Sequence, residues 1–218
     1  EEQADMTICD LYREDKFSRH YMSQKPSDLD HSTVQKELFY RLGGFTWNKL
    51  IRRDVYERYH IAYPKGIYGC EDDYAMAKLL MNNIKIAYLP VAYYHYMYNA
   101  NSLSRHYDEN TYKMDCKILK MFSDLLQGTA AYPYAVKDKT NVIFTHAFWC
   151  GSDCFSSKSF KKTFASYKNR ISELPESNIV KMAMKVSVRG YYKEAHAFIF
   201  SLFLIKQQFK KLLNSMHK

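Results

Sequence analysis

The sequence predicts a mixed α/β fold with a large share of helix. Seven Gly and five Pro in 218 residues are few for an all-β sandwich or barrel, which needs many turns. Short β-prone runs occur in the first half, whereas the second half has the pattern of successive helices. Because 47% of the residues are hydrophobic, the chain can bury a substantial core, and disorder is excluded.

Three elements are expected in the first 60 residues. Residues 6–12 form a short β-prone run and are expected to be a strand. The sequence Ser32-Thr33-Val34-Gln35 resembles a capping box, which would open a helix that Gly43-Gly44 closes. A second helix is expected to start near Thr46 and to bury Trp47, Leu50, Ile51, Val55 and Tyr59.

The next elements flank an acidic triplet. A turn at Pro64-Lys65-Gly66 leads to Glu71-Asp72-Asp73, which is expected to open a third helix because residues 74–80 favour helix. Residues 84–89 and 91–98 are expected to be two strand-like runs broken at Pro90, since proline cannot donate to a β-ladder. A polar loop follows at residues 99–102.

The sequence pattern changes near residue 107 to one that favours helix, and no further clear strand is predicted after this position. Helices are expected at residues 112–126, 136–149, 160–171, 179–189 and 192–213. The predicted division is therefore an α/β domain at residues 1–107 and a helical, basic region at residues 108–218.

Positive charge is concentrated at the end of the chain. The net charge is +9; residues 1–154 hold 19 Lys+Arg and 20 Asp+Glu, and residues 155–218 hold 13 and 3. This asymmetry suggests an acidic partner, either an anionic membrane surface or a nucleic acid, or else a solvated basic helical face. Nucleic acid is the least favoured partner, because aromatic and basic residues are not interleaved in a recognisable motif.

The cysteines and apolar runs predict a reduced, cytoplasmic chain. Five scattered Cys without a CxxC pair indicate neither a disulfide framework nor a zinc site, and Cys150 and Cys154 are expected to be free thiols. No signal peptide is visible at the first residues. The most apolar run, residues 197–205, is much shorter than the ~20 residues of a membrane-spanning helix.

The acidic triplet has both a catalytic and a structural interpretation. Sugar transfer from a nucleotide donor needs a base for the acceptor hydroxyl, and a carboxylate at a helix start can serve. Alternatively, acids in a first helical turn only stabilise the helix dipole.

Four motifs around the triplet occur in a characteristic order. They are Trp47-Asn48-Lys49-Leu50, the stretch from Gly66 to Asp72, Tyr94-His95-Tyr96, and Ser102-Leu103-Ser104. In this order they resemble the acceptor-side half of a bacterial-type family 2 glycosyltransferase with the GT-A fold. The resemblance covers about residues 4–107 and implies a partial GT-A, Rossmann-like sheet with flanking helices, followed by a mainly helical region. It also implies that the nucleotide-binding half lies outside this chain.

The resemblance assigns roles to particular residues. It implies that Asp72 is the catalytic base and that Glu71 orients it or contacts the acceptor. The substrate-binding residues that it implies are Trp47, Asn48, Lys49, Asp73, Tyr96, Ser102, Ser104, Arg105 and His106. Lys49 would approach phosphate or be solvated. The family often has an arginine directly after the Y-x-Y strand, where this chain has Met97. Arg105 or His106 would supply that positive charge instead.

The implied activity is inverting transfer of a sugar from a nucleotide-sugar donor to a saccharide or glycan acceptor, in cell-surface polysaccharide synthesis. Mg²⁺ or Mn²⁺ is expected in the complete enzyme, with its ligands mostly in the other half, and no metal ligand is assigned here. Asp28-Leu29-Asp30 matches the D-x-D pattern of the family's metal motif, but it follows the strand at residues 4–10 instead of preceding it. It is therefore expected to be a loop with helix-capping acids. This chain alone is expected to be inactive.

The expected location is the cytoplasm, with peripheral association to the inner face of the membrane. A homo-oligomer is compatible with the sequence. The alternative function is a non-catalytic module that binds an anionic membrane surface or a partner protein through its basic C-terminal helices.

Overall fold

The computed structural model describes residues 3–15, 18–97, 99, 107–151 and 154–216. The described residues form two compact units. Unit 1 comprises those of Glu1–His106 and Met114–Thr140, and unit 2 those of Tyr107–Lys113 and Asn141–Lys218. The mixed α/β class is confirmed. The functional division at residue 107 remains a prediction.

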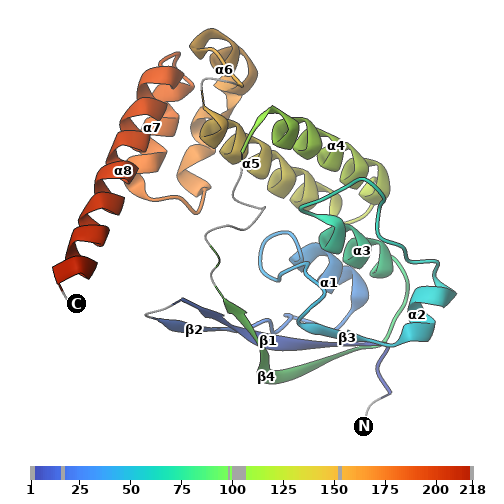
Figure 1. Ribbon diagram of the computed structural model, residues 1–218. Helices are drawn as coiled ribbons and strands as arrows, with labels where there is room; N and C mark the ends of the chain where they lie inside the picture. The colour runs from blue at the N-terminus through green and yellow to red at the C-terminus, as the bar shows by residue number, and fades with distance from the viewer. Residues whose placement is uncertain (1–2, 16–17, 98, 100–106, 152–153, 217–218) are drawn as a thin grey trace. The chain divides into compact units, whose positions relative to one another are not determined.

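The sheet of unit 1 is built around its first strand (Figure 1). Strand β1 (Met6–Glu14) pairs antiparallel with β2 (Arg19–Met22) and β3 (Lys49–Ile51). It pairs parallel with β4 (Ile86–Met97). The predicted strand at residues 6–12 is thus confirmed, and it is the strand on which the other three assemble.

Strand β4 passes through Pro90, so the predicted break into two runs was wrong. Cys9 pairs with Leu89, but the next residue, Asp10, pairs with Ala92. Pro90 and Val91 therefore have no paired residue on β1. Because Pro90 is unpaired, its lack of an N–H group leaves no carbonyl of β1 without a hydrogen-bond donor.

The predicted helix near Thr46 was also wrong at its start. Residues Lys49–Ile51 form β3 instead, because Met6–Ile8 of β1 offers them an antiparallel partner. Only the following segment is helical, as the short α2 (Arg53–Arg58). Leu50, predicted to be in the core, is 76% exposed.

Two further helices lie on one side of the sheet (Figure 1). Helix α1 (His31–Glu37) is capped by Asp30, whose carboxylate accepts a hydrogen bond from the Thr33 N–H at 2.9 Å. The cap is therefore Asp30, as predicted for the acids of residues 28–30, rather than Ser32, and the helix ends before Gly43. Helix α3 (Glu71–Leu79) begins at the acidic triplet, as predicted.

The core of unit 1 joins the sheet to α1, α3 and α4 (Glu109–Leu126). Its fully buried members include Met6 and Ile8 of β1, Met76 of α3, and Phe122 of α4. Helix α5 (Tyr132–Cys150) contributes residues to both units. This core fixes the start of α3 over the sheet.

Unit 2 is helical, as predicted, but the helix expected at residues 160–171 ends at Phe164 and is followed by 3₁₀ turns. It contains α6 (Ser157–Phe164), the 3₁₀ turns η2 (Ala165–Asn169) and η3 (Ile171–Glu173), α7 (Asn178–Ser187) and α8 (Tyr192–Met216). Its core is aromatic, with Tyr192 stacked on Phe160 at 4.1 Å. The Tyr192 hydroxyl donates to the Ala147 carbonyl at 2.8 Å, which ties α8 to α5.

Two features of unit 2 bear on the sequence predictions. The sulfur atoms of Cys150 and Cys154 are paired in the structure, whereas two free thiols were predicted. Helix α8 exposes several large apolar side chains, namely Phe198, Phe200, Phe203, Leu204 and Ile205. Across the described part of the chain, we find no helix with the length and apolar character to cross a bilayer.

Candidate functional site

Asp72 lies beside the segment that leads into Trp47. It occupies the first turn of α3, and its Oδ2 accepts a hydrogen bond from the Thr46 backbone N–H at 3.2 Å. The carboxylate is half-buried at a helix N-terminus, where the dipole favours negative charge. The structure thus brings together two motifs that are 26 residues apart in the sequence.

Asp73 instead belongs to a buried ion pair. Its Oδ2 lies 2.6 Å from Nζ of Lys139 on α5, and Asp138 lies 3.1 Å from the same ammonium. Burial alone would lower the pKa of Lys139, but the neighbouring Asp73, Cys70 and Asp138 outweigh it, so this pKa is raised. Because Lys139 is only 3% exposed, Asp73 anchors α3 to α5.

Glu71 has the opposite character. Its Oε2 is buried and has no hydrogen-bond partner among the described protein groups. A desolvated acceptor without a donor costs about 1–3 kcal/mol, and such groups in native proteins call for an explanation. Of the three acids, Glu71 therefore has acceptor capacity that the fold leaves unused.

Gly44 allows the loop before Trp47 to approach α3. A Cβ atom at this position would lie 2.3 Å from Oδ1 and 3.0 Å from Cα of Asp73. A side chain at this position would have to displace the Asp73 carboxylate, which is held by Lys139. The predicted helix-ending role of Gly43-Gly44 is thus replaced by close packing of this loop against the acidic triplet.

Lys49 binds the same loop through hydrogen bonds from its ammonium group. Its Nζ donates to the carbonyls of Gly43 and Phe45, each at 2.7 Å, and to Oδ1 of Asn48 at 2.8 Å. Burial lowers the pKa of Lys49 to about 7, although Asp73 and Asp72 oppose this shift. All three ammonium hydrogens are used, so Lys49 orders the loop.

The lowered pKa of Lys49 should be visible in the pH dependence of the free energy of unfolding. An unfolded lysine has a pKa of about 10.4, so between pH 7 and 10 the unfolded state binds more protons than the folded state. Lys49 therefore makes the free energy of unfolding rise with pH, by about 2 kcal/mol from pH 7 to 9. In urea unfolding, Lys49→Met should lack this rise, whereas Lys65→Met, at an exposed turn, should retain it. An equal pH profile for wild type and Lys49→Met would contradict the assignment.

Asn48 is buried and joins two strands. The side-chain Nδ2 of Asn48 donates to the Cys9 carbonyl at 2.8 Å, and the backbone carbonyl of Asn48 accepts from the Cys9 N–H at 2.9 Å. With its side-chain oxygen bound to Lys49, both ends of the amide are satisfied within the protein.

Trp47 is the centre of an aromatic stack. Phe45 and Tyr94 lie parallel to it with ring centroids at 4.0 and 4.1 Å, and Tyr96 lies at 5.6 Å. Two rings this close and parallel cannot share one face of the indole, so both faces of Trp47 are covered. Tyr94, which is 38% exposed, is the member of the stack most open to a ligand.

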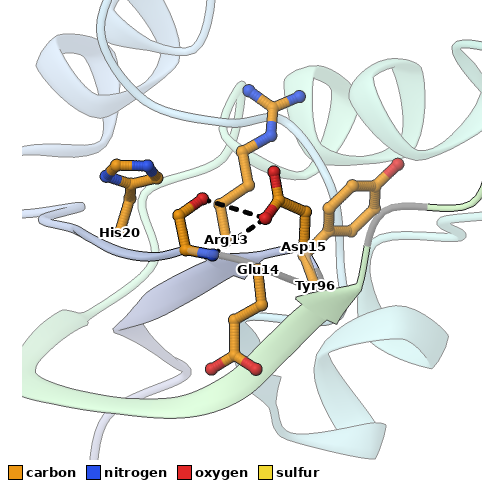
Figure 2. Close-up of a pocket in the computed structure, with 6 residues that line it drawn as sticks. Arg13, Glu14, Asp15, His20 and Tyr96 are labelled. Atoms are coloured by element: carbon orange, nitrogen blue, oxygen red, sulfur yellow. Dashed lines mark hydrogen bonds between the residues drawn. The ribbon is translucent and has the colours of Figure 1, made fainter. Parts of the chain in front are cut away.

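Tyr96 also lines a small cavity at the ends of β1 and β4 (Figure 2). The cavity has a volume of about 140 Å³ and is lined by Arg13, Glu14, Asp15, Ser18, His20 and Tyr96. Arg13 and Glu14 point to opposite sides of the strand, and the guanidinium of Arg13 lies 5.8 Å from the Tyr96 ring centroid. The predicted residues Ser102, Ser104, Arg105 and His106 lie outside the described residues.

Four buried charged groups of the described residues were not predicted from the sequence, namely Asp10, Glu37, Asp115 and Lys139. Asp10 on β1 is fully buried and accepts hydrogen bonds from the Tyr88 hydroxyl at 2.7 Å, the Gln24 N–H at 2.5 Å and the Tyr21 hydroxyl. The sequence could have indicated this buried carboxylate, because Asp10 stands within a mostly apolar predicted strand. Lys139 had no local signal, because Asp73, its partner at 2.6 Å, lies on another helix.

No cluster of three or more His, Cys, Asp or Glu suited to a metal ion occurs among the residues that the structure describes. The expectation of Mg²⁺ or Mn²⁺ thus concerns groups beyond those described here.

No protein-family model matches the chain. It is 21% identical over 175 residues to "Putative glycosyltransferase EpsH" of Bacillus subtilis (strain 168). The aligned region covers 77% of this chain but 51% of that protein, so the chain spans about half the length of its relative. The similarity supports a glycosyltransferase-like relationship and, at this coarse level, suggests glycosyl transfer.

Proposed function

We propose that this chain is the acceptor-side half of an inverting GT-A glycosyltransferase that acts in cell-surface polysaccharide synthesis at the inner face of the membrane. One observation carries the proposal: the hydrogen bond from Thr46 to Asp72 joins the acidic triplet to the Trp47 segment. The similarity to the Bacillus subtilis protein supports the same class of reaction.

In the proposed mechanism Asp72 takes the proton of the acceptor hydroxyl as that oxygen attacks the anomeric carbon of the donor sugar. The bond to the nucleoside diphosphate breaks in the same displacement, which inverts the anomeric configuration. Glu71, whose Oε2 is closed to solvent, would orient Asp72. Mg²⁺ or Mn²⁺, when bound, would neutralise charge on the leaving diphosphate.

The acceptor saccharide would lie on the aromatic stack. Tyr94 offers the exposed ring, and Trp47 holds that ring from behind. Tyr96 extends the surface by about 7 Å, two residues further along β4. Ser102, Ser104, Arg105 and His106 follow this strand and are proposed to contact the acceptor or the diphosphate. Asn48, Lys49 and Asp73 would act by fixing the loop and α3.

Acceptor binding can be tested with the 218-residue chain itself. We expect neutral di- and trisaccharides to bind weakly, and Tyr94→Ala to weaken binding about fivefold, because it removes the exposed stacking ring. Tyr68→Ala is the matched control, since Tyr68 is 57% exposed and lies outside the stack. Saturation-transfer NMR measures both. Equal losses in the two variants, or no binding by any saccharide in a broad panel, would remove the proposed acceptor site.

A further inference from the structure

Unit 2 contains a cationic cavity that the proposed transfer reaction does not use. It is lined by Lys168 and Asn169 of η2, Ser172 of η3, and Lys185 and Arg189 at the end of α7. Its volume is about 350 Å³, room for about a dozen water molecules at their liquid volume. It therefore has space for a phosphate and the group that the phosphate esterifies.

The charges of this cavity have one sign. Three cations and two neutral hydrogen-bonding side chains line it, and no carboxylate does. Glu173, on the same 3₁₀ turn as Ser172, is not a lining residue. The three cations are exposed, and each lacks an ion pair with any described residue. An anion entering the cavity would thus meet no competing internal acid.

Helix electrostatics explain only part of this arrangement. Lys185 and Arg189 lie at the C-terminal end of α7, where the helix dipole favours positive charge. They also line the same cavity, where their like charges repel. Lys168 comes from a different element, so its convergence on the same cavity is not accounted for by the dipole of α7. A bound anion would relieve the repulsion among all three.

The surface next to the cavity is apolar. Met182 is 61% exposed and Ile179 is 44% exposed on α7. Positions 179, 182 and 185 are spaced by three, so the two apolar residues lie on the same face of α7 as Lys185, and Arg189 follows in the turn after α7 and lines the same cavity. We call Ile179, Met182, Lys185 and Arg189 the α7 face. A soluble phosphate would gain nothing from the apolar half of this face.

We propose that the α7 face docks on an anionic membrane, with Lys168, Lys185 and Arg189 around the phosphate of a lipid headgroup and with Met182 and Ile179 in the interface. Interfacial binding of this kind combines buried apolar area with attraction to anionic lipid. The excess of 13 Lys+Arg over 3 Asp+Glu in residues 155–218 adds a long-range attraction to the same surface.

The test is flotation of the 218-residue protein with vesicles of phosphatidylcholine, alone or with 30% phosphatidylglycerol. We expect binding only to the anionic vesicles and a loss of about 30-fold in affinity for Lys185→Gln/Arg189→Gln. The matched control is Lys158→Gln/Lys162→Gln, two exposed lysines of α6 with the same i,i+4 spacing and the same charge change. The control should lose less than threefold.

A second variant separates the membrane from a soluble ligand. Met182→Ser should weaken vesicle binding while leaving the weak binding of glycerol phosphate, followed by NMR, unchanged. Circular dichroism verifies that each variant is folded. Equal losses in the two double variants, equal binding to both vesicle types, or glycerol phosphate binding as tight as vesicle binding would each overturn the proposal.

Discussion

If Asp72 is the base of the proposed reaction, Asp72→Asn in a protein that joins this chain to a nucleotide-binding half is expected to lower kcat for sugar transfer about 1,000-fold, within the range that a general base contributes. Asparagine keeps the shape of the side chain, and its carbonyl can still accept the Thr46 N–H, so the loop before Trp47 should stay in place. Only the ability to take a proton is lost. The measurement is acceptor-dependent release of nucleoside diphosphate from a nucleotide sugar.

The control for this variant is Asp124→Asn. Asp124 is an exposed acid on α4, and its partner Lys120 lies 2.7 Å away. This change should leave kcat unaltered. The affinity of Asp72→Asn for the saccharide acceptor should also be close to that of the wild type, because the aromatic stack is intact. A kcat within tenfold of wild type for Asp72→Asn would exclude Asp72 as the base.

Lys139→Met is expected to destabilise unit 1 by about 3 kcal/mol. The substitution leaves the carboxylates of Asp73 and Asp138 without their buried counter-charge. Because the Asp73 side chain is 30% exposed, water partly compensates, and the loss should fall at the lower end of the range for broken buried pairs. The measurement is the free energy of unfolding in urea at pH 7.

Lys120→Met provides the comparison. Lys120 and Lys139 both form ion pairs shorter than 3 Å, but the Lys120 side chain is 76% exposed and that of Lys139 is 4% exposed. Breaking the exposed pair should cost less than about 1 kcal/mol. The double variant Asp73→Asn/Lys139→Met should be more stable than Lys139→Met alone, because one orphaned charge is removed. Equal losses in the two lysine variants would show that burial does not govern the effect.

Local sequence patterns predicted the elements whose residues settle their own conformation. Helix α3 begins at Glu71 because acids favour a first helical turn and residues 74–79 favour helix. The helices of unit 2 were predicted from apolar periodicity, and most of their bounds agree within a few residues. The strand at residues 6–12 was predicted from its β-prone composition.

The wrong predictions involve segments whose state depends on a distant partner. Residues Lys49–Ile51 have apolar spacing that suits a helix, but pairing with β1 makes them a strand. Pro90 stays within β4 because a shift of register removes it from the ladder. In both cases the deciding hydrogen bonds join residues about 40 or 80 positions apart, beyond the reach of local propensity.

For the candidate site, the amino-acid sequence determined that three carboxylates follow one another at a helix start, close to motifs that resemble those of sugar-transferring enzymes. It did not determine how the three differ. The tertiary structure decided that Asp73 is held by Lys139, 66 residues away, that Asp72 meets Thr46, and that Glu71 keeps a buried oxygen unpaired. The physical reason is that the role of a charge depends on the groups packed around it, and packing brings those groups from distant parts of the chain.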